Sequence, residues 1–95
     1  MHEAFAAQVA SNIQALESNE WAAKLGRSEA IGHVDQSRLN VCGSSIAVGH
    51  PFGATGARIL SQTVKELSTL PSGSRAIVSI CTDGGQGSVM LLAAD

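Results

Sequence analysis

The chain has 95 residues and a formal net charge of −2, which allows one small domain at most. Apolar residues make up 44% and the mean hydropathy is +0.15, values typical of a globular chain and too high for a disordered one. Six basic residues, eight acidic residues and three scattered aromatic side chains offer neither a basic stripe nor a base-stacking platform, so nucleic-acid binding is disfavoured.

The sequence also limits the possible cellular locations of the protein. No apolar run approaches the roughly 20 residues of a membrane span, and the chain starts without the basic region of a secretion signal. Cys42 and Cys81 are too few and too far apart for a disulfide framework, so we expect a cytoplasmic protein. Charged residues make up only 15%, against roughly 25% in soluble domains, which predicts apolar surface that requires a partner.

The first predicted element is a helix over residues 3–17. Its apolar positions recur every three or four residues, and they are Phe5, Val9, Ile13 and Leu16. Asn19 is expected to cap a short turn that ends at Gly26. Residues 27–40 are polar and without periodicity, which predicts an irregular surface loop.

Residues 41–56 are rich in glycine, and a second helix is predicted after them. One face of that helix is apolar, and it consists of Ala57, Leu60, Val64 and Leu67. Two short apolar segments, 76–81 and 88–94, flank a glycine turn and predict a hairpin. An isolated hairpin is marginal in water, and the apolar run 90–94 expects cover on both faces. The predicted fold class is therefore α/β, with two helices on a short sheet that ends in an antiparallel hairpin, as part of a larger α/β layer.

The first candidate site is the segment 49–56, which leads directly into the second helix. Pro51 restricts His50 to an extended backbone, and the neighbouring glycines let a substrate approach the imidazole closely. Histidine is the natural proton acceptor near neutral pH. The alternative is a glycine-rich helix entry with an incidental histidine. A phosphate loop is a poor match because its Gly-Lys-Ser/Thr ending is missing.

The second candidate site is the segment 81–87. Cys81 ends a strand and runs into a glycine turn, whose exposed backbone N–H groups could bind an oxyanion while the thiol acts as nucleophile or acid/base. The alternative is a buried structural cysteine in a hairpin.

The third candidate is His2, at the entrance to the predicted first helix, where a side chain can help bind an oxyanion. The alternative is a solvated histidine near the chain end. Cys42 and His33 have no partner at metal-ligand spacing, so no metal site is expected.

Together, three stretches resemble the C-terminal part of the thiolase family, most closely the thiolase (β) subunits of fatty-acid oxidation complexes. They are residues 2–6 (HEAFA), 40–56 (NVCGSSIAVGHPFGATG) and 81–87 (CTDGGQG). The segments 25–27 and 32–35 are also similar to that subfamily. The resemblance covers essentially all of residues 1–95, in the family's order and spacing.

The resemblance implies thiolysis of 3-ketoacyl-CoA by CoA, or the reverse condensation. In the family a cysteine from the N-terminal half is acylated; His50 would take its proton, and Cys81 would be the second acid/base. His2 would complete an oxyanion hole. Substrate or oxyanion binding would also involve the Asp83 backbone N–H, Gly84, Gly49 and Phe52. No cofactor is implied beyond coenzyme A as co-substrate, and the implied partners are a second copy in the full-length form and a hydratase/dehydrogenase subunit.

Three features depart from the family pattern. Asp83 stands where many members have Gly or Ala, and we expect its carboxylate to point away from the pocket, because it would oppose a developing enolate. Ser44 replaces the second glycine of the usual pair. The chain also matches only a partial C-terminal domain, without the first strands of the repeat or the nucleophile-bearing half. We therefore expect residues 1–95 alone to be inactive and poorly stable.

Two other functions stay open. A small hydrolase would use Cys81 as nucleophile and His50 as base. A non-catalytic interaction domain would pair its exposed helix or hairpin edge with a longer subunit.

Overall fold

A two-stranded antiparallel sheet forms the centre of the computed structural model, which describes residues 1–95. Strand β1 (Arg75–Thr82) pairs with β2 (Gln86–Ala93) in a register that runs from Arg75↔Ala93 to Thr82↔Gln86. The single-turn 3-10 segment η2 (Asp83–Gly85) joins them, and Gly84 and Gly85 supply the positive φ angles of 76° and 71° that this tight turn needs. The predicted hairpin is confirmed, with strand ends shifted by one or two residues.

Helix α4 (Thr55–Leu67) packs along β1. The predicted apolar face is wrong in part: Ile59 and Leu67 are buried, whereas Val64 is 52% exposed. Thr55 also points inward: it is 2% exposed, its hydroxyl contacts His50, and it lies one helical turn from the buried Ile59. The helix is therefore rotated from the orientation that apolar spacing alone predicts.

Helix α1 (Ala6–Glu17) begins three residues later than predicted, because Phe5 is extended at φ −147° and ψ 148°. The short helix α2 (Asn19–Lys24) follows it. Its cap is Ser18, whose Oγ accepts the Trp21 N–H at 3.2 Å, so the prediction of Asn19 as the cap is wrong. Asn19 instead accepts a hydrogen bond from the N–H of Ala30.

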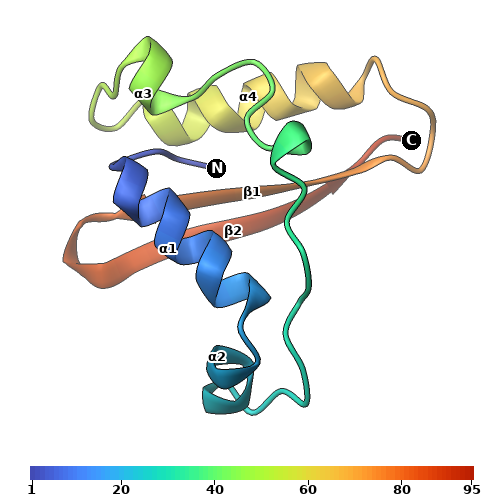
Figure 1. The fold of residues 1–95 in the computed structure, drawn as a ribbon. Coiled ribbons are helices and arrows are strands. Elements are labelled where there is room, and N and C mark those ends of the chain that lie inside the picture. The colour runs from blue at the N-terminus through green and yellow to red at the C-terminus, as the bar shows by residue number, and fades with distance from the viewer.

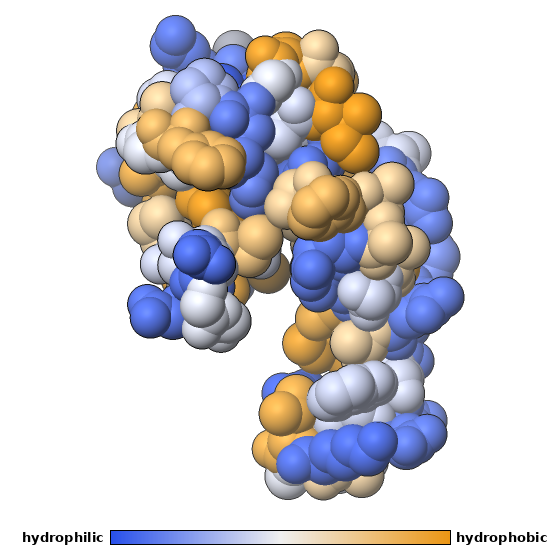
Figure 2. Space-filling model, turned by 90° about the vertical axis from the view of Figure 1, so that its left-hand side faces the viewer, coloured by the Kyte–Doolittle hydropathy of each residue, from blue (hydrophilic) through white to orange (hydrophobic).

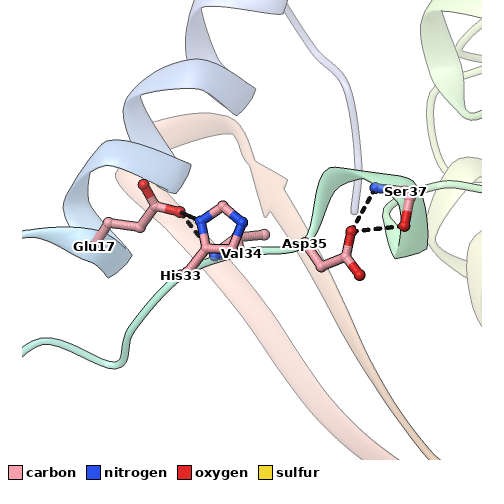
Figure 3. Close-up of polar contacts among 5 residues, drawn as sticks. All are labelled: Glu17, His33, Val34, Asp35 and Ser37. Carbon is pink, nitrogen blue, oxygen red and sulfur yellow. Dashed lines mark hydrogen bonds and ion pairs between the residues drawn. The ribbon is translucent and has the colours of Figure 1, made fainter.

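The irregular loop predicted over 27–40 is confirmed, apart from the 3-10 turn η1 (Gln36–Arg38). Figure 3 shows how it is fastened to the end of α1: Glu17 accepts the Val34 N–H at 2.7 Å and lies 3.0 Å from Nδ1 of His33. Asp35 caps η1 by accepting hydrogen bonds from both the N–H and the hydroxyl of Ser37, which lower the pKa of the Asp35 carboxyl. His33 therefore contacts Glu17 and is not part of the ring contact between the other two histidines.

The short helix α3 (Ser45–Val48), which the sequence did not predict, lies beside α4 above the hairpin, and α1 crosses the hairpin diagonally in this view (Figure 1). Only four apolar residues are buried, and they are Ala22, Ile59, Leu67 and Val78. Figure 2 shows that the end of the molecule that contains α2 projects from the rest and leaves an open hollow beside it. No helix is long and apolar enough to cross a membrane.

One face of the hairpin is bare. Because strand side chains alternate, Val78 turns to the buried side while the paired residues Ile77 and Leu91 turn to the other side. Ile77 is 69% exposed, Leu91 65% and Val89 71%. The cover expected on both faces of the segment 90–94 is not supplied by residues 1–95, and it stays a prediction. We refer to Ile77, Val89 and Leu91 as the bare sheet face.

Candidate active site

His2 is held beside the sheet by the first residues of the chain. Its backbone N–H donates to the Ser79 carbonyl of β1 at 2.8 Å, and its side chain is only 3% exposed. It therefore lies in an extended segment four residues before α1, so its predicted position at a helix entrance and the alternative of a solvated side chain are both wrong. The imidazole Nδ1 lies 2.6 Å from the hydroxyl of Ser45, the first residue of α3.

A polar network ties this segment to the glycine-rich segment. The Glu3 carboxylate accepts the side-chain amide of Asn40 at 2.9 Å and the backbone N–H of Ile46 at 3.0 Å. The Asn40 amide and the Ser44 hydroxyl each donate to the Met1 carbonyl at 2.9 Å. Because Asn40 adopts a left-handed φ of 49°, its side chain can reach both Glu3 and Met1, and the network fixes the backbone on either side of His2.

His50 follows directly from α3. Gly49 ends that helix with a φ of 92°, a conformation that favours glycine, and so turns the chain toward His50. The His50 ring lies with its centroid 4.3 Å from that of His2 and 5.0 Å from that of Phe52. Its Nδ1 is 2.6 Å from the hydroxyl of Thr55 at the start of α4. Two histidines separated by 48 positions in the sequence are thus in ring contact.

Cys81 lies at the end of β1 opposite Gly87, and its thiol is exposed and free. This overturns the alternative of a buried structural cysteine. Cys81 and His2 line one shallow cavity of about 200 Å³, which Gln8 and Asn12 of α1 border on the other side. His50, Gly49 and Phe52 do not line that cavity. His2 therefore connects Cys81 and His50, since it borders the cavity with Cys81 and contacts the ring of His50.

The glycine turn after Cys81 is partly closed by its own aspartate. The Asp83 carboxylate accepts the Gly84 N–H at 2.9 Å, and neither Asp83 nor Gly84 lines the cavity. The Gly84 N–H, one of the predicted oxyanion donors, is therefore occupied in this conformation. It could serve an oxyanion only after losing its bond to Asp83.

Charge and burial favour a neutral His2. Burial is the main cause that lowers its pKa, and the positive charges of His50, the amino terminus and Arg58 lower it further, against the opposing carboxylate of Glu3. Near neutral pH the ring can then act as a hydrogen-bond donor or acceptor without carrying charge.

The second cysteine is in a different environment. Cys42 is exposed, and a hydrogen bond with Glu66 is the largest cause that raises its pKa, so it is not an activated thiol. No group of three or more His, Cys, Asp or Glu side chains is placed to hold a metal ion.

Sequence reasoning missed the residues that orient the two imidazoles, which are Glu3, Asn40, Ser45 and Thr55. A signal was available for Thr55, because a hydroxyl five residues after a histidine, at a helix start, can return to the ring. Ser45 gave none, because its contact with His2 spans 43 positions.

Comparison with known proteins shows the family of the chain. The family model described as "Thiolase, C-terminal domain" matches residues 1–94. The chain belongs to the thiolase family. The resemblance inferred from three motifs is thereby confirmed.

Thiolases from several bacteria match along the whole chain. It is 51% identical to a 3-ketoacyl-CoA thiolase of Klebsiella pneumoniae (strain 342) and 53% identical to one of Shigella dysenteriae serotype 1 (strain Sd197), in both cases over 100% of this chain and 22% of the relative. A 3-ketoacyl-CoA thiolase of Yersinia pestis (strain Pestoides F) is 52% identical over 97% of this chain and 21% of its own length. The chain thus spans about a fifth of these relatives. No solved structure matches it.

Proposed function

We propose that this chain provides the proton-transferring part of a thiolase-type acyltransferase, which converts 3-ketoacyl-CoA and CoA to acyl-CoA and acetyl-CoA or catalyses the reverse condensation. The observation that carries the proposal is that His2 borders one cavity with Cys81 and lies in ring contact with His50. Family membership supports the proposal, since the chain is 51% identical over its whole length to a 3-ketoacyl-CoA thiolase.

In the proposed first half-reaction, a cysteine thiol outside these 95 residues attacks the 3-keto carbon and His50 accepts its proton. The bond between carbons 2 and 3 then breaks, and its electron pair stays on carbon 2 as the enolate of acetyl-CoA. Cys81 gives its proton to that carbon, which releases acetyl-CoA and leaves an acyl group on the nucleophilic cysteine.

In the second half-reaction, the Cys81 thiolate takes the proton of an incoming CoA thiol. The CoA sulfur attacks the acyl-cysteine, acyl-CoA forms, and the displaced cysteine thiolate recovers a proton from His50. All groups of this chain are then back in their starting protonation states.

His2 fits the role of an oxyanion donor in this scheme. Its pKa is lowered, so the ring stays neutral, and it is buried at the edge of the cavity where a negative oxygen would develop. Coenzyme A is the co-substrate, and no other cofactor is part of the proposal. We also propose that the active form is cytoplasmic and works as a dimer, with a hydratase/dehydrogenase subunit as a further partner.

Two assays test this proposal. The purified chain, given acetoacetyl-CoA and CoA, should show no loss of the substrate's enolate absorbance, because the nucleophile is not among its residues. A chimera in which residues 1–95 replace the matching segment of the Shigella dysenteriae 3-ketoacyl-CoA thiolase should turn over.

Within the chimera, His50→Ala and Cys81→Ala should each lower turnover by about 10²- to 10⁴-fold, the range of general acid–base catalysis. The matched controls, His33→Ala and Cys42→Ala, remove the same residue types at exposed positions away from the cavity and should stay near the parent rate. An active Cys81→Ala chimera would refute the proposal.

The hydrolase alternative finds little support. Nδ1 of His50 is held by Thr55, and the Cys81 thiol has no hydrogen bond to any side chain. An activated nucleophile would be alkylated rapidly by iodoacetamide at neutral pH, whereas Cys81 should react at the rate of an ordinary exposed thiol.

One observation favours the alternative of an interaction domain, here in combination with the thiolase function. The bare sheet face is too exposed for a finished domain, and the chain spans about a fifth of its relatives. We propose that the remaining part of a thiolase chain covers this face. Sedimentation of this chain mixed with the remaining segment of the Shigella dysenteriae thiolase would show a joint species, and two separate species would count against the proposal.

A further inference from the structure

We infer that Ser45 and Thr55 are positioning residues that hold the two adjacent imidazoles in opposite tautomers: His2 carries its proton on Nε2, and His50 carries its proton on Nδ1. The mechanistic meaning of this inference rests on the proposed function, but the tautomers themselves follow from the hydrogen bonds. Both hydroxyls lie 2.6 Å from an Nδ1, and they differ in their third partner.

At Ser45 the third partner is a donor. The backbone N–H of Glu3 donates to Oγ at 3.4 Å, and Nδ1 of His2 is the only acceptor within reach of the hydroxyl proton. Ser45 is 5% exposed and His2 3%, so a hydroxyl proton without an acceptor would be buried and unsatisfied. The hydroxyl therefore donates to Nδ1, and the neutral ring must carry its proton on Nε2.

At Thr55 the third partner is an acceptor. The Pro51 carbonyl lies 3.4 Å from Oγ1 and can take the hydroxyl proton, and no N–H group donates to this oxygen. Oγ1 is then free to accept a hydrogen bond from Nδ1–H of His50. Thr55 is 2% exposed, so water does not compete for either bond. The neutral ring of His50 consequently presents a bare Nε2 lone pair.

Opposite tautomers match two different tasks at one site. A protonated Nε2 on His2 can donate to a developing oxyanion, and a bare Nε2 on His50 can accept a proton from a thiol. If both rings carried the same tautomer, the site would have two donors or two bases. The two rings lie 4.3 Å apart, so the donor and the base face the same small region of the site.

The direct test is nitrogen NMR on the chain labelled with ¹⁵N-histidine, at a mildly alkaline pH where the rings are neutral. Long-range ¹H–¹⁵N correlations separate protonated from unprotonated ring nitrogens. Only three histidines are present, and His33→Gln removes the signals of the third. We expect Nδ1 of His2 and Nε2 of His50 to be the unprotonated nitrogens. The same tautomer at both rings, or averaged shifts like those of free histidine, would overturn the inference.

Matched variants test the two hydroxyls. Thr55→Ala should move the His50 proton from Nδ1 to Nε2, the site that a free imidazole prefers, while the His2 signals keep their tautomer. Ser45→Ala should shift the unprotonated Nδ1 of His2 to the position of a nitrogen without a hydrogen-bond donor. The conservative variants Thr55→Ser and Ser45→Thr should retain the parent spectra.

An unchanged His50 tautomer in Thr55→Ala would contradict the inference, as would loss of the parent tautomers in Thr55→Ser and Ser45→Thr, which remain informative if an alanine variant unfolds. Because these spectra do not depend on turnover, they separate the two claims. Opposite tautomers beside an inactive chimera would refute only the proposed function, and equal tautomers beside an active chimera would refute only this inference.

Discussion

The two sides of the candidate site are built very differently. The histidine side, residues 1–3, 40–46 and 49–55, contains all four buried polar residues of the molecule: His2, Ser44, Ser45 and Thr55. The hairpin side, residues 81–89, is exposed at every position. The chain therefore orients its imidazoles with its own hydrogen bonds, whereas the surroundings of the Cys81 thiol remain open to be completed by another part of a thiolase.

The largest effect is expected from a substitution that prevents the remaining thiolase chain from covering the bare sheet face. Leu91→Asp places a charge on the bare sheet face, where the side chain is 65% exposed. In the isolated chain the free energy of unfolding should change by less than about 0.5 kcal/mol, as for exposed positions generally. In the chimera the same charge would be buried against the remaining thiolase chain, so soluble, active enzyme should be lost.

The matched control is Ser72→Asp, which adds the same charge at an exposed turn position outside the sheet and outside the lining of the cavity. It should leave the chimera folded. An active Leu91→Asp chimera would mean that the face stays bare and that the hairpin side is already complete.

A smaller effect compares the stability of the two sides. Glu3→Ala removes the acceptor of the Asn40 amide and of the Ile46 N–H, and it should lower the free energy of unfolding by about 2 kcal/mol. Asp83→Ala removes only a bond to the next residue's N–H at an exposed turn and should cost less than about 0.5 kcal/mol. Urea denaturation measures both, and equal losses would contradict the contrast between the two sides.

The pH dependence of stability should come from the histidine side. His2 has a lowered pKa in the folded chain and an ordinary one near 6.5 when unfolded, so the unfolded state binds more protons between these values. The stability is therefore fully present above pH 6.5 and decreases as the pH falls toward the folded value. His2→Asn should flatten this decrease, and His33→Gln should not. Denaturation midpoints across this pH range provide the measurement.

The sequence predicted the elements that local patterns encode, and it failed where a distant partner decides. The hairpin followed from two apolar runs around glycines, and its ends were nearly correct. The start of α1 was wrong because the backbone N–H of His2 bonds to β1, 77 positions away, and holds the first residues extended. The buried face of α4 was misjudged because apolar spacing gives no weight to Thr55, which is 2% exposed and contacts His50.

The candidate site shows the same division. Motifs located His2, His50 and Cys81, because glycine-flanked histidines and a cysteine at a strand end are visible in one dimension. Their orientation depends on Ser45 and Glu3, whose partners lie about forty positions away and leave no periodic signal. Ser44, noted only as a departure from the family pattern, proves to donate to the Met1 carbonyl and so to hold the segment of His2.

The smallest expected effect concerns the aspartate in the glycine turn. Asp83→Ala in the chimera removes an exposed carboxylate that does not line the cavity, so its charge should contribute little to the barrier. The substitution also frees the Gly84 N–H, which gains no partner unless the oxyanion reaches it. We therefore expect turnover within about threefold of the parent, a change in the barrier of less than about 0.7 kcal/mol. A gain in turnover well beyond threefold would mean that Asp83 opposes the charge of the enolate or withholds the Gly84 N–H from an oxyanion. The hairpin side would then slow the reaction through Asp83.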